Sequence, residues 1–208
     1  EKKEYTSVKT WLGNDYADLP HVSIEEQQLK VNSDDFVIIP EIFANVMEQT
    51  MNLPCKRIVL CQAYDYVLEM LMPGKKWLDY GIRDCITTSE KQAEHLKNLM
   101  GPTLNTNVIP ISIPKFFKPS EKPKKPIIAI FTRDQRDTVK IFKTFYIKYP
   151  HLKWFTFRDM RNMPVEKFAE NMAECCISVW VDDISGFGTF PLESMKCDVP
   201  VLGKVPNM

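Results

Sequence analysis

The chain has 208 residues and a mass of 24.2 kDa, and its 27 basic side chains balance its 27 acidic ones. With 44% hydrophobic and 26% charged residues, its composition is globular and excludes a collagenous, coiled-coil or disordered chain. The zero net charge also argues against duplex DNA or bulk RNA as a partner, because such polymers are bound through many phosphate contacts. Small anionic ligands stay open, since they need only one or two local cations.

The cysteines bear on the cellular compartment, and the two ends of the chain bear on whether it is a whole protein. The six cysteines show no CxxC pair and no zinc-like spacing, so we predict buried thiols in a reducing cytoplasm. No run reaches the ~20 apolar residues of a membrane span, although contact with a membrane surface stays open. The start at Glu1 and the end at Met208, just after an apolar run, predict a piece of a longer protein that is incomplete at both ends.

Short apolar runs alternate with helical stretches through the first half of the chain. The first run is stopped by Pro40, and the sequence from Ser89 to Gln92 matches a capping box at a helix start. The predicted order is strand 35–40, helix 42–51, strand 56–62, strand 84–88, helix 90–100 and strand 107–111.

A proline-lysine segment, K-P-S-E-K-P-K-K-P over residues 118–126, interrupts this alternation. Fixed proline φ angles and repelling lysines favour an extended, solvated linker. We therefore predict an N-terminal domain over 1–117 and a C-terminal domain over 127–208, with a long surface loop inside one domain as the alternative.

The alternation resumes with greater clarity after residue 126. Repeated β-α-β units with short loops imply right-handed crossovers and a parallel sheet with helices on both faces. The predicted fold is α/β, with two Rossmann-like parallel-sheet units. The elements expected here are strand 127–131, helix 138–149, strand 152–157, helix 164–172, strand 177–181, helix 191–196 and strand 199–202.

Ligands of open α/β sheets bind beyond the carboxyl ends of the strands, so the loops after the apolar runs are the places to inspect. The loop after Phe131 carries Arg133 and Arg136 before a helix start, a combination that can hold a diphosphate. The alternative is a solvated cluster in which these arginines pair with Asp134 and Asp137.

The loop after Val181 contains Gly186 and Gly188, which permit close approach of a ligand or a positive φ, and it leads into a helix that carries Glu193. From Ser185 the sequence reads S-G-F-G-T-F-P-L-E-S-M-K-C-D-V-P-V. It resembles the E-G-F-G-x-x-x-x-E-A-M-x-x-G-x-P-V loop of retaining, family 4-like GT-B glycosyltransferases. The resemblance covers about residues 35–203 and is strong only after the linker.

That resemblance implies a glycosyltransferase of the hexosyltransferase class, which moves a sugar from a nucleotide sugar to a carbohydrate or lipid-linked acceptor in polysaccharide or glycoconjugate assembly. Glu193 would accept hydrogen bonds from the ribose hydroxyls, and the helix near Thr189 would point its amides at the diphosphate. The resemblance implies no cofactor and no metal. The implied donor-binding residues are Arg133, Arg136, Gly186, Phe187, Gly188, Thr189 and Glu193.

One departure from the family pattern concerns catalysis. The first glutamate of E-x7-E falls on Ser185, which lacks the carboxylate. Asp183 is a candidate substitute, donor handling could be altered, or the copy could be a degenerate module that binds a nucleotide or a protein partner. We assign no catalytic residue, and we expect the 208-residue chain alone to be inactive as a transferase.

A sugar-phosphate epimerase is disfavoured because no Gly-rich phosphate loop follows an early strand.

Overall fold

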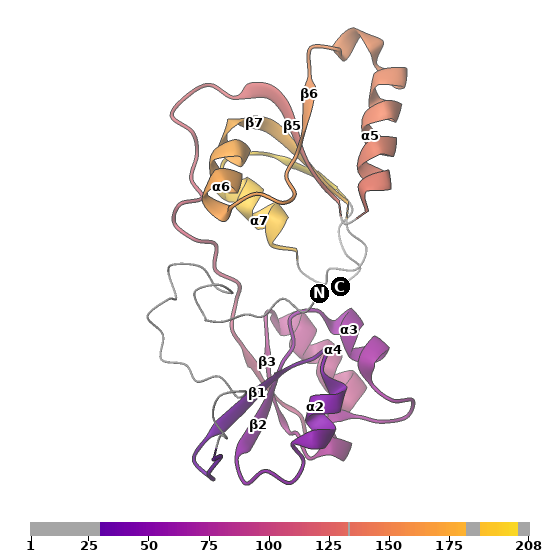
Figure 1. The fold of residues 1–208 in the computed structure, drawn as a ribbon, viewed down its shortest axis with the longest axis vertical. Coiled ribbons are helices and arrows are strands. Elements are labelled where there is room, and N and C mark those ends of the chain that lie inside the picture. Colours follow the sequence, from indigo (N-terminus) through magenta and orange to yellow (C-terminus); the bar gives the residue numbers. More distant parts are fainter. Residues whose placement is uncertain (1–29, 133, 182–187, 204–208) are drawn as a thin grey trace. The chain divides into compact units, whose positions relative to one another are not determined.

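The computed structural model describes residues 30–132, 134–181 and 188–203. These residues form two α/β units, each built on a four-stranded sheet (Figure 1). The pairings of β2 with β3, β3 with β4, β5 with β6, β5 with β7, and β7 with β8 are parallel. The predicted fold, two parallel-sheet α/β units, is therefore confirmed.

The first sheet has the order β1-β2-β3-β4, so each strand lies beside the next one along the chain. Sequence patterns anticipated its strands but missed α3 and η2, which start without a side-chain N-cap hydrogen bond. The elements of this unit are β1 (Phe36–Pro40), α2 (Ala44–Gln49), β2 (Lys56–Leu60), α3 (Tyr64–Met70), the 3-10 helix η2 (Trp77–Tyr80), β3 (Asp84–Thr87), α4 (Glu90–Met100) and β4 (Asn105–Val108).

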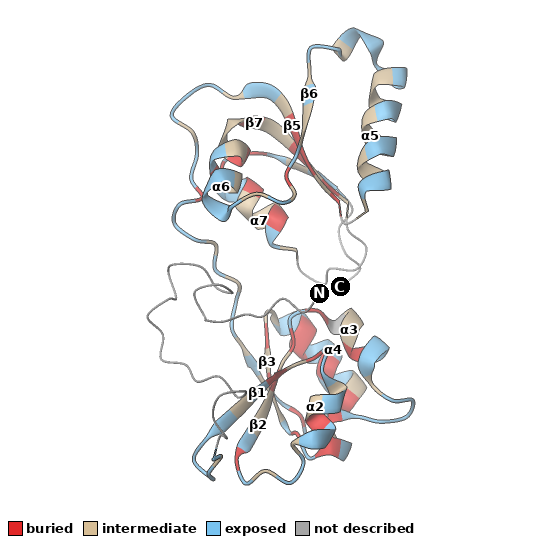
Figure 2. Cartoon of the chain, in the orientation of Figure 1, coloured by how far each residue is buried: buried red, intermediate tan, exposed pale blue. Residues whose placement is uncertain are grey.

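The helices of this unit lie on one face of its sheet. Strands that follow one another in the same direction through right-handed crossovers place every connecting helix on the same side. The side chains of Phe36 and Ile38 on the other face of β1 are exposed, whereas Ile39 is buried (Figure 2). In the described part of this unit the helices therefore cover one face of the sheet. The expectation of helices on both faces concerned the elements after residue 126.

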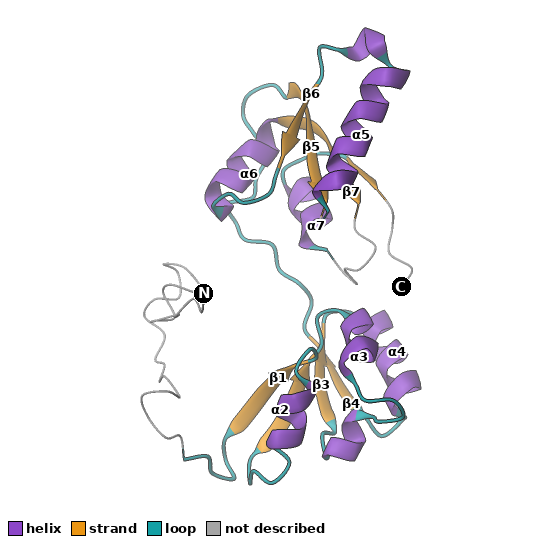
Figure 3. Ribbon diagram, turned by 45° about the vertical axis from the view of Figure 1, so that its right-hand side comes forward, coloured by secondary structure: helices purple, strands orange, loops and turns teal. Residues whose placement is uncertain are grey.

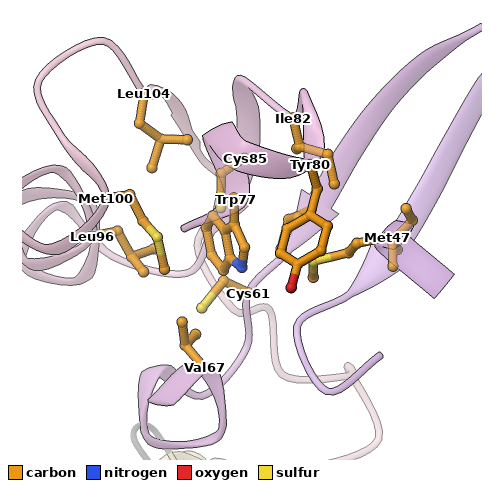
Figure 4. Close-up of a cluster of buried hydrophobic side chains, with 12 residues drawn as sticks. Met47, Cys61, Val67, Trp77, Tyr80, Ile82, Cys85, Leu96, Met100 and Leu104 are labelled. Atoms are coloured by element: carbon orange, nitrogen blue, oxygen red, sulfur yellow. The ribbon is translucent and has the colours of Figure 1, made fainter. Parts of the chain in front are cut away.

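The core of the first unit is built around Trp77, which is fully buried. Figure 4 shows its indole among Cys61 and Cys85 from the sheet side and Leu96 and Met100 from α4. The indole N–H of Trp77 has no hydrogen-bond partner among the described residues. This core is therefore held by packing rather than by a polar network at its centre.

Only half of the predicted capping box forms at the start of α4. The Ser89 hydroxyl accepts a hydrogen bond from Gln92 N at 3.2 Å, as predicted. The Gln92 side chain, however, turns to Thr88 and accepts from its backbone N at 2.9 Å and its hydroxyl at 3.0 Å. Gln92 is buried, so both its ends are committed inside the unit: its Nε2 lies 3.7 Å from Cys61 Sγ.

The second sheet has the order β6-β5-β7-β8. Because the chain reverses direction across the sheet after β6, α5 covers one face and α6 and α7 the other (Figure 3). Helices on both faces are therefore confirmed for this unit. Its elements are β5 (Lys125–Thr132), α5 (Gln135–Lys148), the 3-10 helix η3 (Pro150–Leu152), β6 (Thr156–Asp159), α6 (Val165–Glu174), β7 (Cys175–Val181), α7 (Thr189–Lys196) and β8 (Val201–Gly203).

Strand β6 begins four residues later than the 152–157 pattern predicted. Residues 150–152 form η3 instead, and the Tyr146 hydroxyl donates to the Phe155 carbonyl at 2.6 Å. That carbonyl is thereby bound to α5 rather than to the neighbouring strand. Apolar character alone could not reveal this contact.

The linker packs more than its charge suggested. Lys118–Pro123 is largely exposed, but the preceding Phe117 is buried and meets the Phe168 ring edge-on at 5.9 Å. Lys124 Nζ donates to the carbonyls of Ala173 at 3.0 Å and Cys197 at 2.7 Å. Lys118–Pro123 is thus largely exposed, as expected of a solvated linker, whereas Lys124 near its end is hydrogen-bonded to the second unit. Strand β5 begins at Lys125, two residues before the predicted 127.

The cysteines are free thiols, and all are buried except Cys176, which is half-buried. Burial raises the pKa of Cys85 to about 12 and that of Cys175 to about 11. The prediction of buried thiols is confirmed for all but Cys176. The six cysteines are Cys55, Cys61, Cys85, Cys175, Cys176 and Cys197.

Candidate functional site

The candidate site lies at the carboxyl edge of the second sheet, where β5 and β7 end side by side. Their parallel register pairs Thr132 with Val181, so the loops that follow start next to each other. Arg133 and residues 182–187 lie outside the described residues. The predicted convergence of Arg133 with the glycine loop therefore stays a prediction, as do the roles given to Asp183, Ser185, Gly186 and Phe187.

The exit of β5 is tied to the start of α5 by hydroxyl hydrogen bonds. Thr132 is buried, its Oγ1 donates to the Asp134 carbonyl at 2.8 Å, and it lies 2.6 Å from the Thr138 hydroxyl. Asp134 is the N-cap of α5, and its carboxylate accepts from Arg136 N at 2.8 Å. The loop that holds Arg133 thus has fixed residues on both sides.

Arg136 pairs with Asp134, which is the ion-pair alternative raised from the sequence. Arg136 Nε donates to Asp134 Oδ2 at 2.8 Å. The hydrogen bonds from the Arg136 side chain and backbone N–H lower the pKa of the Asp134 carboxyl to about 2. The Arg136 side chain is 84% exposed all the same. Its remaining N–H donors face solvent at the carboxyl edge, so it can still meet an anion there.

Gly188 serves packing rather than an unusual backbone conformation. It is the N-cap of α7 with φ of −63°, which any residue can adopt. A Cβ at this position would come within 2.5 Å of Trp180 Cζ2, and one at Gly203 would collide with the Trp180 carbonyl. Gly188 thus leaves room for the buried indole of Trp180 and Gly203 for the Trp180 backbone, which explains the glycine at 188 irrespective of any ligand.

Glu193 and Thr189 lie one turn apart on α7 and share a side-chain hydrogen bond. Partial burial raises the pKa of Glu193, and the Thr189 hydroxyl opposes part of that rise. The N-cap of α7 is Gly188, and within the described residues no side-chain oxygen caps the first amides of this helix. The described part of the predicted site therefore offers hydrogen-bond acceptors on Glu193 and backbone donors at the helix start.

A second acid-arginine pair occurs at the same edge, and the sequence patterns did not single it out. Arg161 donates from Nε to Asp159 Oδ1 at 2.9 Å, directly after β6, and its side chain is largely buried. Asp134 also raises the pKa of Arg161, which places the two pairs near each other. The signal available in the sequence was the D-x-R step that follows an apolar run, the same pattern as at Asp134 and Arg136.

The carboxyl edge of the first sheet carries a buried carboxylate. Glu41 follows β1, and its Oε1 accepts hydrogen bonds from the backbone N–H groups of Gln62 at 3.1 Å and Ala63 at 2.8 Å, after β2. Sequence reasoning did not identify this role. The available signal was an acidic residue directly after a buried strand and its closing proline.

The described residues form neither a metal site nor a membrane-spanning helix. No three His, Cys, Asp or Glu side chains gather there into a metal site, and Asp35 is engaged in a turn, where it accepts from Asn32 N at 2.7 Å. No helix in the described part is long and apolar enough to cross a bilayer.

Comparisons with known proteins place this geometry in context. No family model matches the chain. It is 26% identical over 198 residues to an alpha-1,6-glucosyltransferase of Actinobacillus pleuropneumoniae serotype 7 (strain AP76), a match that takes in 91% of this chain and 58% of that protein.

Solved structures share the fold at low identity. The pneumococcal O-GlcNAc transferase GtfA in complex with UDP and GlcNAc matches with a TM-score of 0.58 and 12% identity, over 86% of this chain and 43% of that one. TarM matches with a TM-score of 0.59 and 13% identity, over 89% and 43% respectively. Sucrose-phosphate synthase from Thermosynechococcus elongatus matches with a TM-score of 0.56 and 13% identity, over 82% and 56%.

The chain therefore spans about half the length of the proteins it matches. Its two parallel-sheet units are those of GT-B glycosyltransferase structures, which confirms the predicted fold class.

Proposed function

We propose that this chain is part of a retaining glycosyltransferase that moves a sugar from a nucleotide sugar to a carbohydrate or lipid-linked acceptor. The observation that carries the proposal is the likeness to a glucosyltransferase over 198 residues, which extends across 91% of the chain. The fold shared with a transferase that binds UDP and GlcNAc supports a nucleotide-sugar donor.

The donor would bind at the carboxyl edge of the second sheet. Glu193 would accept the ribose hydroxyls, because a carboxylate suits two adjacent hydroxyl donors. The backbone amides at the start of α7 would face the diphosphate, with Arg133 and the exposed Arg136 as cations. In such transfer the negative charge grows on the leaving diphosphate, so these donors would act on the transition state.

A direct test is calorimetric titration of UDP into the full-length protein and its variants. Glu193→Ala should weaken UDP binding by about 1 to 3 kcal/mol, because ribose hydroxyls lose their partner. Glu170→Ala, on the exposed surface of α6, is the matched control and should leave the affinity unchanged. Equal affinities of wild type and Glu193→Ala would remove Glu193 from the site.

The alternative is a catalytically degenerate module that binds a nucleotide or a protein partner, and Ser185 favours it because the first glutamate of E-x7-E is missing. Turnover of a panel of nucleotide sugars distinguishes the two. Measurable transfer that rises in Ser185→Glu would support an enzyme limited by the missing carboxylate. UDP binding without turnover in either form would support the module. Running the 208-residue chain beside the full-length protein tests whether the chain alone is inactive.

A further inference from the structure

The chain from Val139 to Arg158 carries an excess of positive charge. It holds five basic side chains and no acidic one, in a protein whose net charge is zero. Lys140 pairs with Asp137 and Arg158 with Glu174. Lys143, Lys148 and Lys153 are exposed, and within the described residues no ion pair involves any of them.

Large apolar side chains are exposed beside these lysines. Ile147 is 79% exposed, the largest value among the big hydrophobic residues of the described chain, and Trp154 is 59% exposed. Tyr149 is exposed as well. We call this group of six residues the α5 tip: Lys143, Ile147, Lys148, Tyr149, Lys153 and Trp154.

The aromatic members of the α5 tip are held by a rigid base. The Trp154 ring stacks on Phe155 with centroids 4.0 Å apart, and Phe155 meets Phe145 of α5 edge-on at 6.5 Å. Tyr149 packs on the same Phe145 at 5.7 Å. The exposed rings are therefore preorganised, and little side-chain entropy is lost when they bind.

The α5 tip is remote from the candidate donor edge. Helix α5 starts after the carboxyl end of β5 and runs back along the sheet, so its last turn lies at the amino-terminal end of the strands (Figure 1). A ligand at the tip would leave the loops after β5 and β7 free. The tip is thus not part of the site described above, and it does not depend on the proposed function.

We propose that the α5 tip binds the surface of an anionic lipid membrane. Tryptophan and tyrosine favour the headgroup layer, and an exposed isoleucine can enter the acyl boundary. Lysines gain from an anionic leaflet while their stems cover apolar surface. The uniform positive charge around the apolar residues is what selects anionic lipid, because an apolar interface between protein copies would bring these unpaired lysines together.

Vesicle co-sedimentation of the full-length protein tests this proposal. Binding is expected to vesicles of equimolar phosphatidylcholine and phosphatidylglycerol and not to phosphatidylcholine alone, and it should weaken with added salt. The triple variant Lys143→Gln, Lys148→Gln, Lys153→Gln should lower the partition constant about 100-fold, since each cation near an anionic leaflet changes it about fivefold.

The matched control changes the net charge equally but at other sites. Lys91→Gln, Lys97→Gln, Lys122→Gln removes three exposed lysines outside the α5 tip and should bind vesicles like wild type. Ile147→Ser, at a side chain that packs little, should reduce binding severalfold without loss of thermal stability.

Three results would overturn the proposal. One is equal binding to both kinds of vesicle, and another is an equal loss in the two triple lysine variants. The third is light scattering that shows a dimer which Ile147→Ser converts to monomer, since the tip would then contact a second copy.

Discussion

The indole of Trp180 on β7 occupies the space beside Gly188 that any side chain there would need. Gly188→Ala should therefore lower the free energy of unfolding by about 1 to 3 kcal/mol, as overpacked cores do. Urea denaturation would measure it. In a Trp180→Phe background the same substitution should cost less, because the smaller ring leaves room. An equal cost in both backgrounds would show that the contact is not the cause.

Glu41 joins the ends of β1 and β2 through two backbone N–H groups. Glu41→Ala leaves both donors without their acceptor in a buried place and should cost about 1 to 3 kcal/mol of unfolding free energy. Glu41→Gln should cost less, since its amide oxygen can still accept. Glu48→Ala, on the exposed side of α2, is the control for loss of a glutamate. If Glu41→Ala matches that control, the two hydrogen bonds do not stabilise the edge.

Trp77 fills the centre of the first core, yet its N–H has no partner among the described residues. Trp77→Phe should thus lose packing but no hydrogen bond, whereas Trp77→Ala should lose about 3 to 5 kcal/mol through the cavity it leaves. Thermal or urea unfolding of the two variants gives the comparison. A phenylalanine variant as unstable as the alanine one would indicate that the indole N–H is bonded after all.

The Asp134 carboxyl has a pKa of about 2, below its ordinary 3.8, chiefly because Arg136 donates to it. A carboxyl whose folded pKa is depressed stabilises the fold above its unfolded pKa. That stability is lost as the pH falls from about 4 through about 2. Carboxyl NMR titration should show the low pKa in wild type and a higher pKa in Arg136→Gln, which loses the guanidinium but keeps the backbone N–H donor. No change in that variant would assign the shift to another group.

The pKa of the Glu193 carboxyl shifts in the opposite direction, because burial raises it above 4.5. Its contribution to stability is greatest at low pH and declines as the pH rises through the folded pKa. Glu193→Gln should remove that decline while its amide oxygen still accepts from Thr189. The variant should consequently gain unfolding free energy relative to wild type between pH 4 and neutral pH. A constant difference across this range would mean that Glu193 titrates normally.

Local sequence was sufficient for the elements whose signals are local. Proline after an apolar run ended β1, the Ser89 hydroxyl capped α4, and the start of α7 was predicted within two residues. The rule that ligands bind beyond the carboxyl ends of parallel strands pointed to the loops after β5 and β7, and these two strands end side by side.

Other features depend on contacts between residues far apart in the chain. The Gln92 side chain turned to Thr88 and Cys61, Lys124 found the carbonyls of Ala173 and Cys197, and Gly188 was needed by Trp180. Strand order likewise decided that, among the described elements, helices lie on one face of the first sheet and on both faces of the second. The sequence by itself determined the alternation of elements and the positions of the candidate ligand loops. Only the tertiary structure decided which polar groups are already bonded to each other, because each such pairing depends on a distant partner that brings its atoms into reach.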